Sequence, residues 1–369
     1  MKLTIDHTKL ADTVAFATSA LPARPPVPVL AAVKLTATDG ELSVAAYDYE
    51  LAATATATAD VHNHGQALVS GRLLADITRT IRQDVHLTTT DTQAILEAGT
   101  ANFTLPLLPL EEYPTQPDLP APTGTVSGRL LADAIAQVTP AVSRDDTLPV
   151  LTGIQISLDG TALTLAATDR YRFAVRTIDW KPTDGDHPVH RVLAPAKALQ
   201  DIAKGMAAAD GDVTLALPEG DHTIGLTTGQ HRTTLRTLEG KLPDYDALFP
   251  TEFTATAIVD TDALTAAIKR VALVADRNTP VSLSFTNGSV TAQAGTTDDA
   301  QAIDTTDATH TGDDIDIAFN PTLLLDGLKA VGTDRVQLDF TTPVKPALLH
   351  GEGAPDRALR YLLMPVRTS

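Results

Sequence analysis

The sequence has 369 residues, which is long enough for two or three domains with separate hydrophobic cores. It contains no cysteine, so disulfides, thiolate metal sites and cysteine nucleophiles are excluded. The 46 acidic and 28 basic residues give a net charge of −18, which argues against a protein that wraps tightly around a polyanion. Residues 1–7 lack the apolar run of a signal peptide, and no window is long and apolar enough to span a membrane. We therefore expect a cytoplasmic location and no membrane contact.

Along the chain, apolar residues recur with helical spacing in three pairs of segments, and a pair of alternating, strand-like runs follows the first segment of each pair. Asp-Gly or Asn-Gly separates the two runs each time, which is a strong signal for a β-hairpin. The predicted helices are 10–21, 72–81, 131–142, 197–206, 264–275 and 322–331. The predicted hairpins are 33–44, 154–165 and 281–292.

The second helix of each pair repeats in detail. Residues 72–81, 197–206 and 322–331 read RLLADITRTI, KALQDIAKGM and TLLLDGLKAV, so an acid, a base and a leucine recur at a period of 125 residues. Ser70 and Ser127 each precede a GRLLAD segment in a helix N-cap position. Such periodicity predicts three copies of one α+β unit, each with two helices packed on antiparallel sheet. With proline- and acid-rich linkers at 114–122 and 242–250, the predicted domains are 1–124, 125–251 and 252–369.

Catalytic signatures are missing from the sequence. We find no G-x-S-x-G, P-loop, H-E-x-x-H or G-x-G-x-x-G motif. The His62-Asn63-His64 segment does not supply a closed set of metal ligands and is typical of a polar loop, and the acid pairs of the chain are typical of solvated loops. We therefore expect no enzyme activity, no metal and no cofactor.

Basic residues lie on the second helices. Arg72 and Arg79 are two helical turns apart and share a face of their helix, and so do Lys197 and Lys204. The third copy has only one of the two basic residues, Lys329, at the position of Arg79 and Lys204. In one helix this is typical of a solvated face in which Asp76 supports Arg79. Because basic residues recur on the second helix of all three repeats in an otherwise acidic chain, we instead predict that these helices line one common surface that faces a polyanion. A protein that encircles DNA needs only weak phosphate contacts, because topology retains it, and negative charge elsewhere reduces nonspecific binding.

Four segments resemble the bacterial DNA polymerase III beta sliding clamp family. ATDRYRFA at 167–174 is similar to its T-D-x-[HY]-R-[LF]-A motif, and YLLMPVR at 361–367 is similar to its closing Y-x-x-M-P-x-R. GKLPDY at 240–245 and RPPVPVL at 24–30 resemble two further family segments. The resemblance covers the whole chain.

The resemblance implies a non-catalytic homodimer, closed head to tail into a ring around double-stranded DNA. It implies a pocket between the second and third domains for short hydrophobic peptides of the replicative polymerase, clamp loader, other polymerases and repair proteins. The implied pocket residues are Leu151, Thr168, Arg170, Tyr171, Arg172, Phe173, Pro243, Leu248, Leu362, Met364, Pro365, Val366 and Arg367. The implied DNA-facing residues are Arg24, Arg72, Arg79, Lys197, Lys204 and Lys329. The implied dimer residues are Phe103, Leu273, Val274, Asp298 and Asp299.

Two other functions stay open at this point. A repeat-built protein-binding scaffold that never encircles DNA is compatible with the triplication alone. A hydrolase with an unfamiliar site would require a nucleophile and base that the sequence does not display. Residues that resemble the clamp family favour the ring, with a location in the cytoplasm on the nucleoid.

Overall fold

The computed structural model describes residues 1–183, 190–208, 211–217, 222–245, 247–274, 279–295, 300–355 and 357–367. Its contacts group the chain into two compact units. Unit 1 comprises residues 1–128, 181–184 and 204–237, and unit 2 comprises 129–180, 185–203 and 238–369. The middle repeat is divided between them, so the boundaries after residues 124 and 251 stay a prediction.

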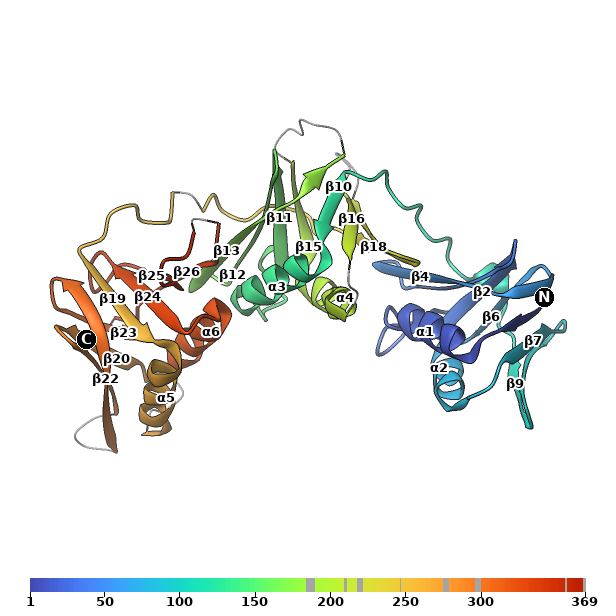
Figure 1. Ribbon diagram of the computed structural model, residues 1–369, viewed down its shortest axis with the longest axis horizontal. Helices are drawn as coiled ribbons and strands as arrows, with labels where there is room; N and C mark the ends of the chain where they lie inside the picture. The colour runs from blue at the N-terminus through green and yellow to red at the C-terminus, as the bar shows by residue number, and fades with distance from the viewer. Residues whose placement is uncertain are drawn as a thin grey trace. The chain divides into compact units, whose positions relative to one another are not determined.

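Unit 1 has two antiparallel sheets (Figure 1). The five-stranded sheet has the order β5-β1-β7-β8-β9, and the nine-stranded sheet has the order β14-β10-β16-β17-β18-β4-β3-β2-β6. The elements of the first repeat are β1 (Lys2–Ile5), α1 (His7–Thr18), η1 (Pro28–Ala31), β2 (Ala32–Thr38), β3 (Glu41–Tyr47), β4 (Leu51–Thr58), β5 (Asp60–Asn63), β6 (Gly65–Ser70), α2 (Gly71–Thr80), β7 (Val85–Thr89), β8 (Gln93–Ala98), β9 (Ala101–Pro106) and η2 (Leu110–Glu112). The remaining strands are β10 (Gly124–Ser127), β14 (Lys181–Pro182), β16 (Asp212–Ala216), β17 (Thr223–Thr228) and β18 (His231–Arg236).

Unit 2 is built on one twelve-stranded sheet with the order β15-β11-β12-β13-β26-β25-β24-β19-β22-β21-β20-β23. Its elements from the middle repeat are α3 (Gly128–Val138), η3 (Thr139–Ala141), η4 (Pro149–Thr152), β11 (Gly153–Asp159), β12 (Ala162–Thr168), β13 (Arg172–Asp179), β15 (His190–Pro195) and the start of α4 (Ala196–Ala208). The third repeat contributes β19 (Ala255–Asp260), α5 (Thr261–Val271), η5 (Ala272–Val274), β20 (Val281–Thr286), β21 (Ser289–Gly295), β22 (Gln301–Gly312), β23 (Ile315–Phe319), α6 (Pro321–Val331), β24 (Arg335–Phe340), β25 (Ala347–Gly351) and β26 (Arg360–Leu363).

The predicted helices and hairpins are present, although the helix bounds differ by a few residues and residue 275 of the predicted helix 264–275 lies outside the described residues. Local chemistry accounts for several of their ends. Asp6 caps α1 by accepting the N–H groups of Thr8 and Lys9 at 2.9 and 3.0 Å. The first hairpin turns through Asp39 and Gly40 at φ 49° and 80°, the left-handed pair that suits a two-residue turn. Ser70 stands at the N-cap of α2, as expected from the sequence, but its side chain makes no capping hydrogen bond.

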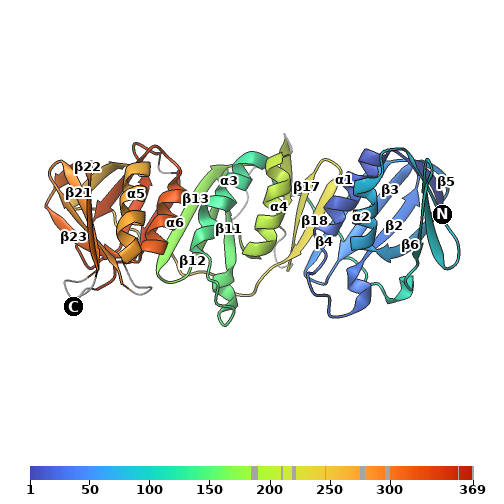
Figure 2. The same cartoon turned by 90° about the horizontal axis from the view of Figure 1, so that it is seen from below.

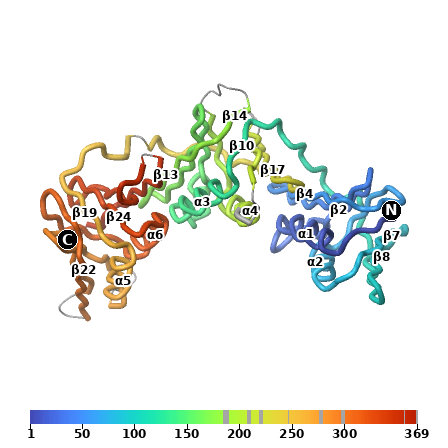
Figure 3. The backbone as a smooth tube through the Cα atoms, in the orientation of Figure 1, coloured from blue at the N-terminus to red at the C-terminus, as the bar shows by residue number. Residues whose placement is uncertain are grey.

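Helices α1 and α2 of unit 1 lie against each other and cover one face of the strands β4, β3 and β2 (Figure 2). Leu10 and Val14 of α1 and Leu74 of α2 are fully buried in this core. The connection between β9 and β10, residues 107–123, passes over the opposite face of the same strands (Figure 3). In the part of the chain that the structure describes, no helix has the length and apolarity needed to cross a membrane.

Candidate functional site

The turn between β12 and β13 sets the direction of two predicted pocket residues. The Asp169 carboxylate accepts the backbone N–H groups of Tyr171 and Arg172 at 3.0 and 3.1 Å. Thr168 is buried, accepts the N–H of Arg170 at 3.1 Å and donates its hydroxyl to the carbonyl of Arg172 at 2.7 Å. Arg170 has a φ of 79°, a strained value for a residue with a Cβ. The turn therefore leaves the Tyr171 ring 59% exposed and directs Arg172 inward.

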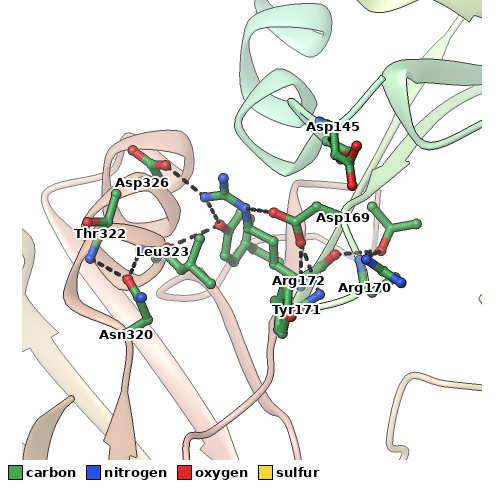
Figure 4. Close-up of polar contacts among 12 residues, drawn as sticks. Asp145, Asp169, Arg170, Tyr171, Arg172, Asn320, Thr322, Leu323 and Asp326 are labelled. Atoms are coloured by element: carbon green, nitrogen blue, oxygen red, sulfur yellow. Dashed lines mark hydrogen bonds and ion pairs between the residues drawn. The ribbon is translucent and has the colours of Figure 1, made fainter. Parts of the chain in front are cut away.

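Arg172 is the centre of a buried ion-pair network (Figure 4). Its Nε donates to Asp169 at 2.9 Å, and its Nη1 donates to Asp326 of α6 at 2.8 Å and to the Tyr361 hydroxyl at 3.0 Å. Tyr361 in turn donates to the carbonyl of Leu323 at 3.1 Å. Burial alone would lower the pKa of Arg172, but Tyr361, Asp326 and Asp169 outweigh it and raise that pKa. The network ties the β12–β13 turn to helix α6.

Strand β26 brings the C-terminal motif beside this turn. Phe173 pairs with Leu362 in the β13–β26 ladder, and the N–H of Met364 donates to the carbonyl of Tyr171 at 2.9 Å. The Met364 side chain is 42% exposed. Farther on, the N–H of Val366 donates to the carbonyl of Ala318 at 2.7 Å, which holds the end of the chain against β23. Exposed apolar side chains thus surround the ion-pair network.

Below these residues lies an apolar cluster that anchors the second linker. Leu151, Phe173 and Leu362 pack with Leu242 and Phe249 of the linker. The Phe173 and Phe249 rings stand edge to face with their centroids 6.3 Å apart, a favourable arrangement of aromatic quadrupoles. The cluster fixes the floor of the exposed surface above it.

The structure thus gathers most of the predicted pocket residues within unit 2. A cavity of about 250 Å³ is lined by Val366 and Arg367 together with Val344 and Ala318. Leu248 is 48% exposed in the linker that contacts Phe173, whereas Pro243 is exposed and Pro365 is half-buried. We define the peptide surface as Tyr171, Leu248, Met364 and Val366, the exposed apolar members of the predicted set.

Sequence reasoning missed several residues that hold this surface. Asp326 recurs with Asp76 at the repeat period, yet Asp76 pairs with Arg79 on its own helix at 3.1 Å and Asp326 pairs with Arg172 instead. The signal that could have found Asp326 is the arginine of the T-D-x-Y-R motif, since a buried guanidinium needs carboxylate partners. The linker residues Leu242, Tyr245 and Phe249 were also missed.

All six predicted DNA-facing residues are exposed. Arg72 donates to the carbonyls of Pro22 and Ala23 at 3.0 and 2.7 Å, and so it holds the loop that carries Arg24. Lys197 lines a cavity of about 530 Å³ in unit 2 with Arg144. The other predicted positions are Arg79, Lys204 and Lys329.

The predicted dimer residues that the structure describes are exposed or half-buried. Phe103 is half-buried on β9, the edge strand of the five-stranded sheet, and Leu273 is 85% exposed. Val274 is half-buried beside it. Asp298 and Asp299 lie outside the described residues. Ile303, which the sequence reasoning missed, is 61% exposed on β22.

One group of possible metal ligands is present among the described residues, namely Asp6, His7 and Asp84. Asp6 already caps α1, and backbone hydrogen bonds lower its pKa. This group therefore has a structural role in the helix terminus.

Comparison with known proteins gives a consistent result over the whole length. Family models of the DNA polymerase III beta subunit match residues 1–117 (N-terminal domain), 125–244 (central domain) and 246–367 (C-terminal domain). The beta sliding clamp of Streptomyces coelicolor is 50% identical over an alignment of 377 residues that covers 100% of both chains.

Solved structures agree with these matches. The clamp of Pseudomonas aeruginosa bound to griselimycin has a TM-score of 0.93 and 26% identity, with 100% of both chains covered. The clamp of Bacillus subtilis, at 24% identity over 100% of both chains, has a TM-score of 0.93 and supports the fold. The three clamp domains, the α+β fold and the family motifs together establish that this chain belongs to the DNA polymerase III beta subunit family, the bacterial beta sliding clamps.

Proposed function

We propose that this protein is a non-catalytic DNA sliding clamp that encircles duplex DNA and tethers the replicative polymerase to it. The observation that carries this proposal is the end-to-end match of three clamp domains to a beta sliding clamp at 50% identity. Tethering raises the effective concentration of the polymerase at the primer end, and this gives processivity without any catalytic group in the clamp. The scaffold that never encircles DNA is not favoured.

The charge distribution supports sliding. The chain carries −18 overall, yet exposed Arg or Lys residues recur on the second helix of each repeat. A few weak phosphate contacts suit a protein that must move along DNA, because each neutralised phosphate adds affinity and salt dependence. We assign Arg24, Arg72, Arg79, Lys197, Lys204 and Lys329 to this DNA-facing set.

The peptide surface is the proposed docking site for the polymerase, the clamp loader and repair factors. It presents Tyr171, Leu248, Met364 and Val366 above a rigid floor, and a flexible methionine adapts to different apolar partners. Arg172 has a positioning role, since it is 7% exposed and holds the turn from below. Replacement of Met364 by alanine should weaken the binding of a polymerase C-terminal peptide, whereas the same change at exposed Leu130 should not.

Ring closure is proposed to use the exposed edges of β9 and η5. Phe103 of one protomer would pack against Leu273 and Val274 of its partner, with Ile303 as an added apolar contact. A head-to-tail contact of this kind closes into a dimer when the rotation fits. We place the assembled clamp in the cytoplasm on the nucleoid.

Retention on circular DNA tests the function directly. The labelled protein is loaded onto a nicked plasmid by a clamp loader with ATP, and the complex is gel-filtered at moderate salt before and after one double-strand cut. We expect the protein to stay on the circle and to leave the linear form. Retention on both the circular and the linear form would mean that direct contacts with DNA, and not a topological link, hold the protein. No retention on the circle despite an active clamp loader would contradict the proposed ring.

A further inference from the structure

A third cavity lies in unit 1, and none of its lining residues belongs to the peptide surface. Its volume is about 840 Å³, and residues 110–119 of the first linker cover it. The floor is the face of β2, β4 and β18 that points away from α1 and α2, and it presents Lys34, Thr54 and Arg232. Figure 1 shows β4 and β18 side by side beneath this linker. A cavity of this size fits a small organic ligand.

The backbone around this cavity repeats that of the peptide surface. Asp48 accepts the N–H groups of Glu50 and Leu51 at 3.0 and 2.8 Å, as Asp169 does for the two residues that follow its turn. Tyr49 has a φ of 77°, close to the 79° of its counterpart Arg170. Strand β4 pairs with β18 as β13 pairs with β26. The two places are therefore equivalent junctions between successive repeats. We call the pairing of β4 with β18 the first junction and the pairing of β13 with β26 the second junction.

Side chains differ at the equivalent positions. In the second junction Phe173 pairs with Leu362, whereas in the first junction Ala52 pairs with Thr234. In the next row Val175 pairs with Arg360, whereas Thr54 pairs with Arg232. Small side chains in the first junction leave open the volume that large ones fill in the second.

The linkers differ in the same way. Phe249 and Tyr245 of the second linker pack on Phe173, and the Arg360 guanidinium lies 4.7 Å from the centre of the Phe249 ring. The first linker places Pro117 and Leu119 over its cavity, and Tyr113 also lines it, but no cation–π contact to Arg232 is found among the residues that the structure describes. The first junction thus has the arginine of a cation–π pair without the ring.

Polar groups in the cavity lack protein partners. Thr234 is only 7% exposed, and its hydroxyl has no hydrogen-bond partner. Tyr113 also lines the cavity, and burial raises its pKa to about 12, so its hydroxyl stays protonated. Among the described residues, no carboxylate lies within 4.0 Å of Lys34 or Arg232. Buried polar groups are almost always partnered in native proteins, which points to a ligand.

We infer that this cavity is a binding site for an aromatic carboxylate. The ring would stack on Arg232 over the small residues Ala52 and Thr54, and the carboxylate would accept from Lys34 and the Thr234 hydroxyl. Glu111 and Asp118 on the covering linker offset the charge of the two cations, which disfavours a polyphosphate. None of these residues belongs to the peptide surface or the DNA-facing set, so the inference goes beyond the proposed function.

Calorimetric titration of the full-length protein with 2-naphthoate tests the site. We expect a dissociation constant in the millimolar range, typical of so small a ligand, and about tenfold weaker binding by Arg232→Ala. Arg236→Ala is the matched control, because Arg236 lies on the same strand and outside the cavity lining. It should bind like the unmodified protein.

Two further variants separate the ligand from the fold. Ala52→Phe restores the ring of the second junction and should abolish binding, while Thr234→Val should weaken it several-fold without loss of folding. A parallel titration with the blocked dipeptide N-acetyl-Phe-Asp-amide identifies the source of the carboxylate. Tighter binding of naphthoate favours a free metabolite, and tighter binding of the dipeptide favours a segment of a partner protein. Equal binding by Arg232→Ala and the unmodified protein, or no binding of either probe, would overturn the inference.

Discussion

The two junctions between repeats share one backbone arrangement, but their side chains make different structures from it. In the second junction, Phe173 and Phe249 fill the outer face of the sheet, and Arg172 is buried in an ion-pair network that fixes the adjacent exposed surface. In the first junction, Ala52 and Thr234 leave a polar cavity beneath the linker. Equivalent strand pairing thus specifies where a site can form. The volume of the side chains on the paired strands decides whether that site is filled by a packed apolar cluster or left as an open cavity.

The largest effect is expected at Arg172, which has no buried counterpart in the first junction. Arg172→Met removes the cation from three buried or half-buried partners and should lower the free energy of unfolding by about 3–5 kcal/mol, because the carboxylates stay uncompensated. Differential scanning calorimetry measures the loss. Arg170→Met, on the same turn but exposed, is the control and should change stability by less than about 0.5 kcal/mol. Similar losses from both variants would remove the special role of Arg172.

The linkers should differ in how strongly they are anchored. Phe249→Ala removes a ring that contacts Phe173, Tyr245 and Arg360, and should cost about 3 kcal/mol of unfolding free energy. Leu119→Ala removes a 37% exposed side chain and should cost less than about 1 kcal/mol. Chemical denaturation of the two variants checks the difference. A larger loss from Leu119→Ala would reverse the comparison.

Histidines near the two junctions should give opposite pH dependences. The side-chain hydrogen bond that His350 on β25 donates to Asp339 raises the pKa of His350, so its stabilising effect is present below the ordinary value of 6.5 and is lost as the pH rises through the raised pKa. Burial lowers the pKa of His231, which stacks on Phe16 at 4.0 Å, so its contribution is present above 6.5 and is lost as the pH falls through the lowered pKa.

Melting temperatures from pH 5 to pH 9 test this pair. His350→Gln should lose most stability at the acid end of the range, and His231→Phe should gain most there relative to the unmodified protein. Parallel curves for either variant and the unmodified protein would show that the histidine does not change its protonation on unfolding.

The smallest effect is expected at Thr234. Thr234→Val replaces a buried, unpartnered hydroxyl with a methyl group of similar size and should raise the free energy of unfolding by about 1 kcal/mol. Thr233→Val on the neighbouring position of β18, which points to the opposite face, is a useful comparison. A destabilised Thr234→Val would show that the hydroxyl has a partner within the folded protein.

The sequence by itself determined the local elements and their threefold repetition. Apolar spacing placed the helices, and Asp39-Gly40 and its two counterparts placed the hairpins, because these signals depend on residues close together in the chain. The family motifs also predicted that Tyr171 and Met364 share one surface, whereas the structure buries Arg172, a third residue of the predicted pocket, in an ion-pair network. A prediction from periodicity treats the copies as equal, and the order of helices and strands follows this closely, apart from the single long strand β22 in the third repeat.

Only the tertiary structure decided where the copies diverge. Asp76 and Asp326 share a repeat position, yet the first serves its own helix and the second pairs with Arg172, which is 154 residues away in the chain. The same holds for Thr234 and Leu362, whose roles follow from the linker that crosses above each. Long-range packing sets these partners, and a pattern of local spacing contains no information about which side chain arrives from a distant strand.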